Sequence, residues 1–450
     1  MLKQTYRTLV AGLAAALAIS ACSGPAATST APTPVPATPV PATPAATSAA
    51  GAPRFTHPTE ITNPLYPVSL TRYTIALGQE GGEPARTEIT LLPGTRMIEW
   101  GGPPTEARVV QFMAMVGGRL VEVAYDYFAQ ADDGSVYYMG EDVTNYKDGV
   151  AVDQSGSWLA GKDGAPPALI MPAQPRVGQM FNPENLPGVV FERDKVLSLN
   201  KQTITPAGPI DNGLFVEETL MDGSIEHKIY AANFGIVEES ASDERSNLVL
   251  YLRADAQPQA VPTPLTTIEA QAEDIIDVVA AGSWGQASND VAAAATAWQA
   301  YQAGNNSVPK PLQDALAAAL ARLQQTTAAK QTGATLQAAN DLSAAVADLF
   351  MVYQPVLPAD LGWLDVLDRQ VRLDVAANDL TAAADSLARA GAVWARVKPA
   401  VLAHKGADAA AQFEASLAAQ QQALAAKNRA ALAAEAEHAL ALVDTLEGLF

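Results

Sequence analysis

Val121-Glu122-Val123-Ala124-Tyr125-Asp126-Tyr127 places a large apolar side chain at every second position and a small or charged one between. Successive side chains of a strand point to opposite faces of a sheet, so this period predicts a strand with one buried face and one face in water. Thr71-Arg72-Tyr73-Thr74-Ile75-Ala76-Leu77 repeats the period. Residues 54–255 are therefore predicted to form an antiparallel β domain, either one meandering sheet or a partly rolled barrel.

Glycine-containing turns separate the predicted strands, at Asp133-Gly134, Asp148-Gly149 and Asp222-Gly223. These dipeptides accept the positive φ angles of tight hairpins, so consecutive strands are expected to be neighbours. Residues 109–116 are apolar on both faces and are expected to form a central strand, whereas the charged segment 189–199 is expected nearer an edge. Prolines break the pattern between Gly161 and Gly188, and a loop of that length is more often a functional lid than a plain connector.

A second pattern begins after residues 256–264, a short Pro-rich segment that we predict to be a linker. The composition changes there to Ala, Leu, Gln and Asp, and apolar residues recur at helical spacing at Leu361, Leu364, Leu367, Val371 and Val375. Asp365 with Arg369 and Asp368 with Arg372 are expected to pair along the flank of this helix, and Asp360 to assist its start. The C-terminal part is therefore predicted to be all-α.

This helical part is an internal repeat. Residues 276–302 match residues 372–398 at an offset of 96, which pairs Gly282 with Asn378 and Trp298 with Trp394, and a later offset of 97 pairs Lys330 with Lys427. Two tandem helical bundles are predicted, at 265–355 and 356–450, each with about four helices. Both tryptophans are interpreted as core anchors. The predicted helices span 267–281, 284–302, 311–328, 333–353, 362–377, 380–398, 407–426 and 428–449.

The beginning of the chain carries an export signal. Lys3 and Arg7 precede an apolar stretch, residues 10–19, that is too short to remain as a membrane-spanning helix. Ile19-Ser20-Ala21-Cys22 resembles the lipobox of bacterial lipoproteins. The resemblance implies that residues 1–21 are removed, that Cys22 is diacylated, and that the protein is held on the extracytoplasmic side of a bacterial cell membrane. Ser23 resembles the residue that directs such proteins to the outer membrane of diderm bacteria.

Cys22 is the only cysteine in 450 residues, which excludes an intramolecular disulfide and a multi-cysteine metal site. Residues 22–53 carry Pro-Ala-Thr repeats that cannot build a core, and we predict a tether of extended polyproline character. At about 3.1 Å per residue it could hold the body up to roughly 90 Å from the bilayer. The alternative is a disordered leader without a spacing role.

The chain is strongly acidic, with 28 Lys and Arg against 48 Asp and Glu and a net charge of −20. A phosphate backbone would be repelled, so nucleic acid is excluded as a partner. Anionic headgroups would be repelled too, so membrane contact is expected through the N-terminal lipid alone.

Several short motifs spread over residues 71–240 resemble a recurring domain of uncharacterised secreted bacterial proteins. They are Tyr138-Met139-Gly140-Glu141-Asp142, Gly156-Ser157-Trp158-Leu159-Ala160-Gly161, Ile170-Met171-Pro172-Ala173-Gln174-Pro175 and Glu226-His227-Lys228-Ile229-Tyr230. The resemblance implies no activity and no catalytic residues. The strand pattern also resembles, more loosely, the curved sheets of periplasmic lipid carriers.

Known catalytic patterns fail on inspection. Residues 156–162 have the spacing of a phosphate-binding loop, but Asp163 stands where a magnesium-binding Ser or Thr belongs, and Pro166 follows where a helix must start. His227 is expected on a buried face with Ile225 and Ile229, and Glu226 on the other face. Acid pairs are interpreted as solvated edges because adjacent strand residues face opposite sides; they are Glu141-Asp142, Glu217-Glu218 and Glu238-Glu239.

No cofactor is predicted. Glu435 and His438 lie one helical turn apart and are weak candidates for a metal site, which would require carboxylates from another helix. A solvated charged face is the simpler interpretation of the pair.

Three hypotheses about function remain. The first is a non-enzymatic binding or scaffold module for an envelope protein or another partner. The second is a carrier of an apolar ligand or lipid in the β domain, with Trp158, Met171, Met180 and Phe181 as wall residues. The third is a metal protein or an enzyme whose residues follow no recognisable spacing.

Overall fold

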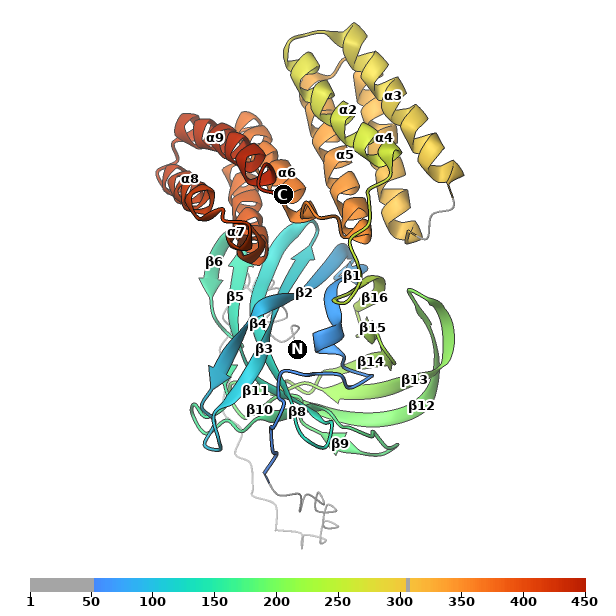
Figure 1. Ribbon diagram of the computed structural model, residues 1–450, viewed down its shortest axis with the longest axis vertical. Helices are drawn as coiled ribbons and strands as arrows, with labels where there is room; N and C mark the ends of the chain where they lie inside the picture. Colours follow the sequence, from blue (N-terminus) through green and yellow to red (C-terminus); the bar gives the residue numbers. More distant parts are fainter. Residues whose placement is uncertain (1–51, 305–307) are drawn as a thin grey trace, which may run out of the picture.

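A computed structural model describes residues 52–304 and 308–450. An antiparallel sheet forms the N-terminal part, and helices follow it toward the C-terminus (Figure 1). The prediction of a multidomain α+β chain, with an antiparallel β part before an all-α part, is confirmed. The signal peptide, Cys22 and residues 22–51 of the tether lie outside the described residues.

The described strands follow a short 3₁₀ helix, η1, at Val68–Leu70. They are β1 Thr71–Glu80, β2 Glu83–Ile98, β3 Thr105–Val116, β4 Arg119–Gln130, β5 Val136–Lys147, β6 Val150–Asp153, β7 Trp158–Leu159, β8 Ala168–Met171, β9 Met180–Phe181, β10 Asn185–Leu186, β11 Val190–Phe191, β12 Arg193–Thr205, β13 Gly208–Thr219, β14 Ile225–Ala231, β15 Gly235–Ser240 and β16 Glu244–Arg253.

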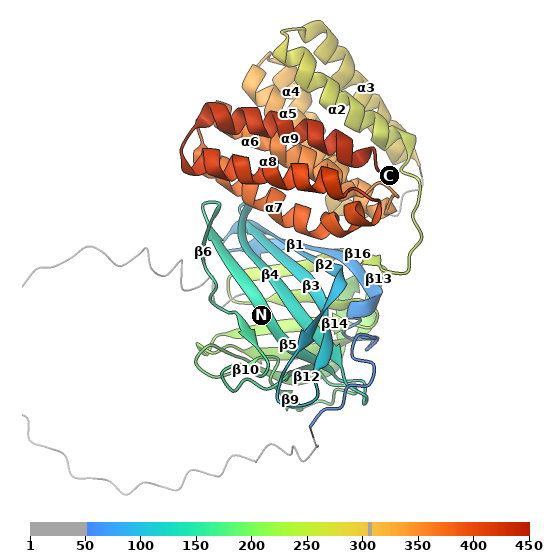
Figure 2. The same ribbon diagram turned by 60° about the vertical axis from the view of Figure 1, so that its left-hand side comes forward.

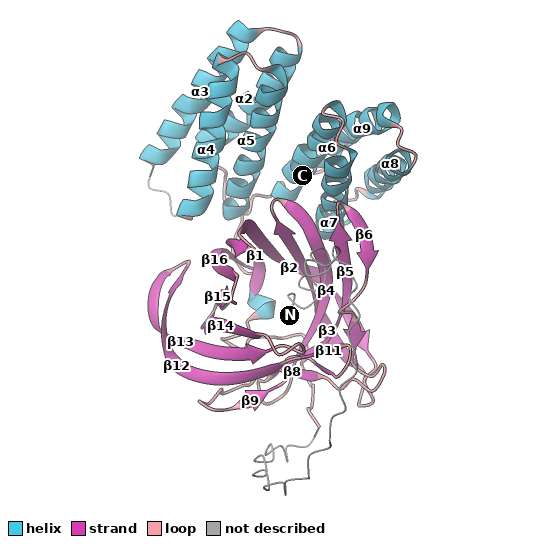
Figure 3. Ribbon diagram, turned by 180° about the vertical axis from the view of Figure 1, so that it is seen from behind, coloured by secondary structure: helices cyan, strands magenta, loops and turns pink. Residues whose placement is uncertain are grey.

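The sheet is a meander whose first and last long strands are neighbours. Its order is β6-β5-β4-β3-β2-β1-β16-β15-β14-β13-β12-β9, with β7 and β8 paired to β5. All three predicted Asp-Gly turns lie between consecutive strands. Strand β3, which contains residues 109–116, is central in the sheet. The expected Pro-rich loop holds the short strands β8, β9 and β10, of which β8 pairs with β5, β9 pairs with β12, and β10 pairs with β11 in a separate two-stranded sheet. The sheet curves strongly without closing (Figure 3).

The helices form two units with the same internal order. The first unit contains α2 Thr263–Ala280, α3 Trp284–Ala303, α4 Lys310–Ala328 and α5 Thr332–Tyr353, and the second contains α6 Ala359–Ala376, α7 Leu380–Ala403, α8 Ala407–Ala425 and α9 Arg429–Glu447. In each unit the first helix packs against the second and the fourth. All eight predicted helices are present within the described residues.

Backbone geometry supports the repeat. Gly282 and Asn378, paired at an offset of 96, both end a helix with positive φ, at 75° and 64°. Lys330 and Lys427, paired at 97, do the same at 51° and 53°. Short chain reversals of this kind favour Gly or Asn, because few other side chains accept a positive φ without strain.

Trp298 and Trp394 are buried in separate cores, one for each helical unit. The interpretation of both residues as core anchors is therefore confirmed. Trp394 also donates from Nε1 to Oε1 of Glu414, at 3.1 Å.

Two local predictions about the helices are wrong. The helix expected to stop at residue 398 continues through Pro399 to Ala403, so the proline does not end α7. Asp368 does not pair with Arg372 on a flank: it is fully buried and accepts a hydrogen bond from Nε2 of Gln420, at 2.9 Å. Arg372 pairs instead with Glu437. The expected pair of Asp365 and Arg369 is present, at 3.0 Å.

The curved sheet uses both faces. Its inner face encloses the main β core, which contains Tyr138, Val196 and Leu214. The opposite face of β1 and β16 places Tyr73 and Leu252 in the core of the first helical unit.

None of the described helices has the length and apolar character needed to cross a bilayer.

Candidate functional site: the interface between the sheet and the helices

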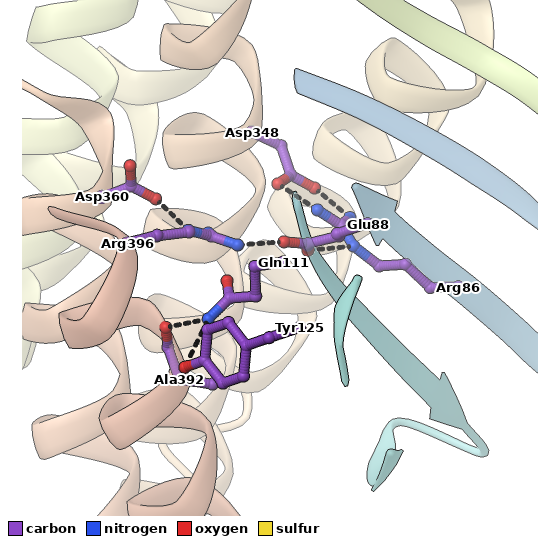
Figure 4. A network of polar contacts seen from close by, with 8 residues as sticks. All are labelled: Arg86, Glu88, Gln111, Tyr125, Asp348, Asp360, Ala392 and Arg396. Carbon is purple, nitrogen blue, oxygen red and sulfur yellow. Dashed lines mark hydrogen bonds and ion pairs between the residues drawn. The ribbon is translucent and has the colours of Figure 1, made fainter. Parts of the chain in front are cut away.

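A chain of buried ion pairs joins the sheet to both helical units (Figure 4). Arg86 on β2 binds Asp348 on α5 in bidentate fashion, at 2.6 and 2.8 Å, and its Nε donates to Glu88 at 2.8 Å. Arg396 on α7 donates to the other oxygen of Glu88 at 2.5 Å and to Asp360 on α6 at 2.6 Å. Glu88 thus lies between two arginines that belong to different parts of the fold.

The two arginines of this network control the charge of Glu88. Burial alone would raise the pKa of Glu88, but Arg86 and Arg396 outweigh that effect and lower the pKa to about 2. Two further bonds extend the contact: Gln111 Nε2 donates to the Ala392 carbonyl at 2.9 Å, and the Leu120 amide donates to Asp385 at 2.8 Å. The helices are therefore held at a fixed position by bonds with defined directions, and the spaces between them and the sheet have a fixed shape.

One of these spaces is a cleft of about 730 Å³, bounded by β4, β5 and β6 on one side and by α7 and α8 on the other. Figure 2 shows α7 lying across the ends of these strands. We call it the outer cleft, because it lies on the opposite face of the sheet from the β core. Its lining residues include Val123, Tyr125, Tyr146, Asp148, Gly149, Leu380, Leu387, Gly391, Leu424 and Lys427.

Polarity within the outer cleft is graded. Val123, Leu387 and Ala392 are buried and form its apolar depth, together with the half-buried rings of Tyr125 and Tyr146. Asp148 and Lys427 are both exposed, at the turn before β6 and at the turn between α8 and α9. An apolar interior with a few polar groups at the rim suits a ligand with an apolar body and a polar end.

Two glycines border this cleft, and close packing requires a glycine at only one of them. Gly149 has a φ of 74°, and a Cβ there would lie 2.2 Å from the backbone nitrogen of Asp385, so the β5–β6 turn touches α7 directly. Gly391 lies inside α7, where glycine weakens a helix by about 1 kcal/mol relative to alanine. A Cβ on Gly391 would meet nothing within 4 Å. Close packing therefore does not explain Gly391, which borders the open space of the cleft.

A second polar group lies on the inner face of the sheet. Asp126, Glu141, Glu184, Asp194 and Glu218 are all at least nine-tenths buried there, as is Lys228. Lys228 binds Glu218 at 2.5 Å, the Tyr138 hydroxyl donates to Asp126 at 3.0 Å, and the Glu184 carboxyl is hydrogen-bonded to Glu141. We call these residues the inner acidic cluster.

Burial controls the charge of this cluster. It raises the pKa of Asp126 to about 7 and raises the pKa values of Glu141, Glu184 and Asp194 well above their ordinary value. Glu218 differs because the Lys228 ammonium outweighs its burial and lowers its pKa to about 2. Burial therefore favours the protonated, neutral form of most of these acids, which explains how several acids share one interior with Lys228.

The cavities beside the cluster are small. One, of about 100 Å³, is bordered by Asp126, Glu141 and Lys228, and a neighbouring one of about 100 Å³ is bordered by Phe128, Ile236 and Leu248. Side chains fill most of the inner face, so the space available for a ligand is much larger in the outer cleft.

The predicted wall residues of an apolar carrier do not converge on a cavity. Trp158, Met171 and Phe181 are buried together in the β core, where the Trp158 ring meets Tyr138 edge-on at 5.3 Å. Met180 is 55% exposed and points away from them. None of the four borders any of the cavities named here.

Glu435 and His438 do lie together, with Oε2 of the glutamate 3.3 Å from Nδ1 of the histidine. Both are partly exposed, and the described residues contain no group of three or more His, Cys, Asp or Glu side chains arranged to hold a metal ion. Lys162 of the failed phosphate-loop motif is exposed in a turn.

Three predictions about the strand faces are wrong. On β4, Glu122 and Asp126 were expected on the face in water, but they are buried, at 2% and 9% exposed. Glu141 and Glu218, expected at solvated edges, are buried, and only their neighbours Asp142 and Glu217 face outward. On β14 the inner face carries Glu226, Lys228 and Tyr230, whereas Ile225 is 42% exposed. His227 stacks on Phe215 at the outer surface. The alternation of β14 was visible in the sequence, but it did not show which face is inside.

Comparison with known proteins adds no assignment, because no family model and no curated protein matches the chain.

Proposed function

We propose that the protein is an extracytoplasmic bacterial lipoprotein, anchored through Cys22, that acts as a non-enzymatic binding module for an apolar or amphipathic small molecule. The anchor rests on the lipobox-like sequence before Cys22. The binding site rests on one observation, the outer cleft of about 730 Å³. That volume falls within the roughly 300–1,000 Å³ of small-molecule sites, which concentrate between folded parts of a chain.

The outer cleft is a better ligand site than the inner face of the sheet. Each inner cavity holds about 100 Å³, well under the roughly 300 Å³ at which ligand pockets begin. For a carrier function, we therefore propose a ligand site between β4–β6 and α7–α8 instead of one in the β core.

Gly391 provides the test of this site. Gly391→Leu places a side chain into open space and improves the helix, so it should block the cleft without unfolding the protein. Gly333→Leu is the matched control, since Gly333 is another helical glycine with nothing within 4 Å of its Cβ position and it does not border the cleft. The fluorescent apolar probe 1-N-phenylnaphthylamine should bind the wild type and Gly333→Leu saturably and bind Gly391→Leu at least tenfold more weakly. Equal binding to all three proteins would place the site elsewhere.

The anchor has a separate test. Cys22→Ala in the full chain should move the protein from the membrane fraction to the soluble fraction while probe binding is retained. Retention at the membrane would contradict lipid attachment at Cys22.

An envelope protein is the second candidate partner, because Val356 and Leu357 between the helical units are 63% and 39% exposed. Such a partner would be lost from cross-linked material in the double variant Val356→Ser/Leu357→Ser, with probe binding unchanged. A cross-linked partner that persists in this variant would argue against this surface.

A further inference from the structure

A basic surface lies at one edge of the sheet, in a protein whose net charge is −20. Strand β9 is the edge strand there: it pairs with β12 on one side, and no described strand pairs with its other side. Arg193 and Lys195 on β12 are exposed, as is Arg176 in the segment that leads into β9. Three basic side chains therefore face solvent around one short strand.

The acidic residues of the same stretch face the interior. Glu184, Glu192 and Asp194 are each 1% exposed. Burial raises the pKa values of all three well above their ordinary values, which favours their neutral forms. Glu192 and Asp194 alternate with Arg193 and Lys195, so side chains of opposite sign point to opposite faces. An acidic chain presents a basic surface here for that reason.

None of the three basic side chains forms an ion pair with a carboxylate among the described residues. Arg193 lies over the Phe191 ring, 6.0 Å from its centroid. Glu217 is opposite Lys195 in the register of β12 and β13, but its Oε2 lies 3.9 Å from Nε2 of His227. Exposed positive charges without a carboxylate partner suit an anionic partner from outside the chain.

Exposed aliphatic side chains lie among these charges. Val177 is 63% exposed, Met180 55% and Val189 45%. Met180 is opposite Lys195 in the pairing of β9 with β12, so the two side chains share a face. Val189 lies in the turn of the β10–β11 hairpin, which leaves the chain between β9 and β12. We call the following residues the β9 edge surface: Arg176, Val177, Met180, Val189, Arg193 and Lys195.

Strands β9 and β10 lie at the end of the molecule opposite the helices (Figures 1 and 2). The described chain begins at the same end, where the segment that leads to η1 starts. A tether that continues from this point to a lipid on Cys22 would bring this end toward the membrane. The helical units would then face away from it.

We propose that the β9 edge surface rests on the anionic lipid headgroups of the membrane that carries the protein. Its basic side chains meet the lipid phosphates, and its aliphatic side chains reach the boundary between headgroups and acyl chains. The net charge of −20 does not prevent this contact, because salt screens charges that lie more than about 8–10 Å away. The inference revises the expectation of contact through the N-terminal lipid alone. It rests on the proposed anchor, and the test separates the two.

The test uses the full lipidated chain in vesicles of phosphatidylcholine, with or without phosphatidylglycerol. A polarity-sensitive nitrobenzoxadiazole label is attached at Met180→Cys, or at Leu402→Cys on α7 as the control, where the native side chain is 46% exposed. Cys22 is the only native cysteine, and a lipid on its sulfur leaves the introduced thiol alone to react. We expect phosphatidylglycerol to shift the emission from position 180 to shorter wavelength and to leave the emission from position 402 unchanged.

Variants assign the shift to the basic residues. Arg193→Gln/Lys195→Gln, made in the Met180→Cys protein, should remove most of it, because each basic residue near an anionic surface strengthens binding about fivefold. Lys310→Gln/Arg322→Gln removes two exposed positive charges from α4 and is the charge-matched control. The shift should persist in this control.

The same emission at position 180 with and without phosphatidylglycerol, or an undiminished shift in Arg193→Gln/Lys195→Gln, would overturn the proposal. A shift that follows the density of protein in the vesicles instead of the lipid charge would also overturn it, in favour of pairing with a second copy of the chain. Failure of the anchor is seen separately, as a label on Cys22 and as loss of the protein from pure phosphatidylcholine vesicles. An unanchored chain that binds only the anionic vesicles would support the β9 edge surface without the anchor, and one that binds neither kind would overturn both.

Discussion

Arg396 on α7 and Glu88 on β2 form an ion pair, with 2.5 Å between Nη1 and Oε2, in which 2% and 3% of the side-chain surfaces remain exposed. The two residues lie 308 positions apart in the chain and come from different parts of the fold. Burying an isolated charge is strongly unfavourable, so each residue constrains the other. The pair fixes α7 against the sheet and so sets the width of the outer cleft.

Glu88→Gln should loosen this interface. The substitution keeps the size of the side chain but leaves Arg86 and Arg396 with one buried carboxylate fewer, and breaking a buried pair in this way destabilises proteins by about 3–5 kcal/mol. We expect a lower urea midpoint for unfolding followed by circular dichroism. Glu106→Gln, at an exposed position on β3, is the control. An unchanged midpoint for Glu88→Gln would mean that other contacts hold the helices.

Asp126 predicts a loss of stability as the pH rises. Its pKa is raised from 3.8 to about 7 in the folded protein, so its carboxyl stays protonated in the fold after it has ionised in the unfolded chain. The contribution of Asp126 to the free energy of unfolding is fully present below about pH 4 and is lost as the pH rises toward about 7. Asp126→Asn keeps an oxygen to accept from Tyr138 and should flatten the decline between pH 4 and 7. The free energy of unfolding measured across this range checks the prediction, with exposed Asp133→Asn as control; an identical slope in all three proteins would contradict it.

Glu88 and Glu218 predict the opposite behaviour in acid. Their pKa values are lowered from 4.5 to about 2, so their contribution is complete above pH 4.5 and is lost as pH falls toward 2. We therefore expect thermal unfolding temperatures to fall between pH 4.5 and 2, and to fall less steeply in Glu88→Gln. An equally steep fall in that variant would mean that Glu88 does not cause it.

A side chain at position 149 should have a local effect at the mouth of the outer cleft. Gly149→Ala introduces a Cβ 2.2 Å from the Asp385 nitrogen, so the β5–β6 turn must move away from α7. Gly223→Ala is closely matched: it also lies in an Asp-Gly turn, with φ of 85° against 74°, and meets nothing within 4 Å. Hydrogen exchange at the start of α7 should accelerate in Gly149→Ala alone. Equal exchange in both variants would show that the turn and α7 are not in contact.

The elements that follow from local periodicity were predictable. The strand at residues 121–127, the Asp-Gly turns and the offset that pairs Gly282 with Asn378 reflect short-range preferences, and the structure follows them. The alternation in residues 121–127 did not show which face is inside, since Glu122 and Asp126 are buried. Helix ends were less certain, because α7 continues through Pro399 where a proline usually marks a stop.

The inner acidic cluster and the interface were not predictable, because both depend on partners distant in sequence. Glu218 is buried since Lys228 and neighbouring protonated acids share its site, and no spacing within β13 indicates this. Glu88 likewise meets Arg396 only after the second helical unit has packed on the sheet. Charged residues at alternate positions of a strand, such as Glu226 and Lys228, were the one available signal of a polar interior.

Native mass spectrometry of the full chain, released by mild detergent from the cells that make it, tests the central claim most directly. The account predicts a small molecule bound to the wild type and to Gly333→Leu, absent from Gly391→Leu, with an N-terminal peptide whose mass includes a lipid on Cys22. The same added mass on Gly391→Leu, or bare chains in all three proteins, would contradict a ligand site in the outer cleft.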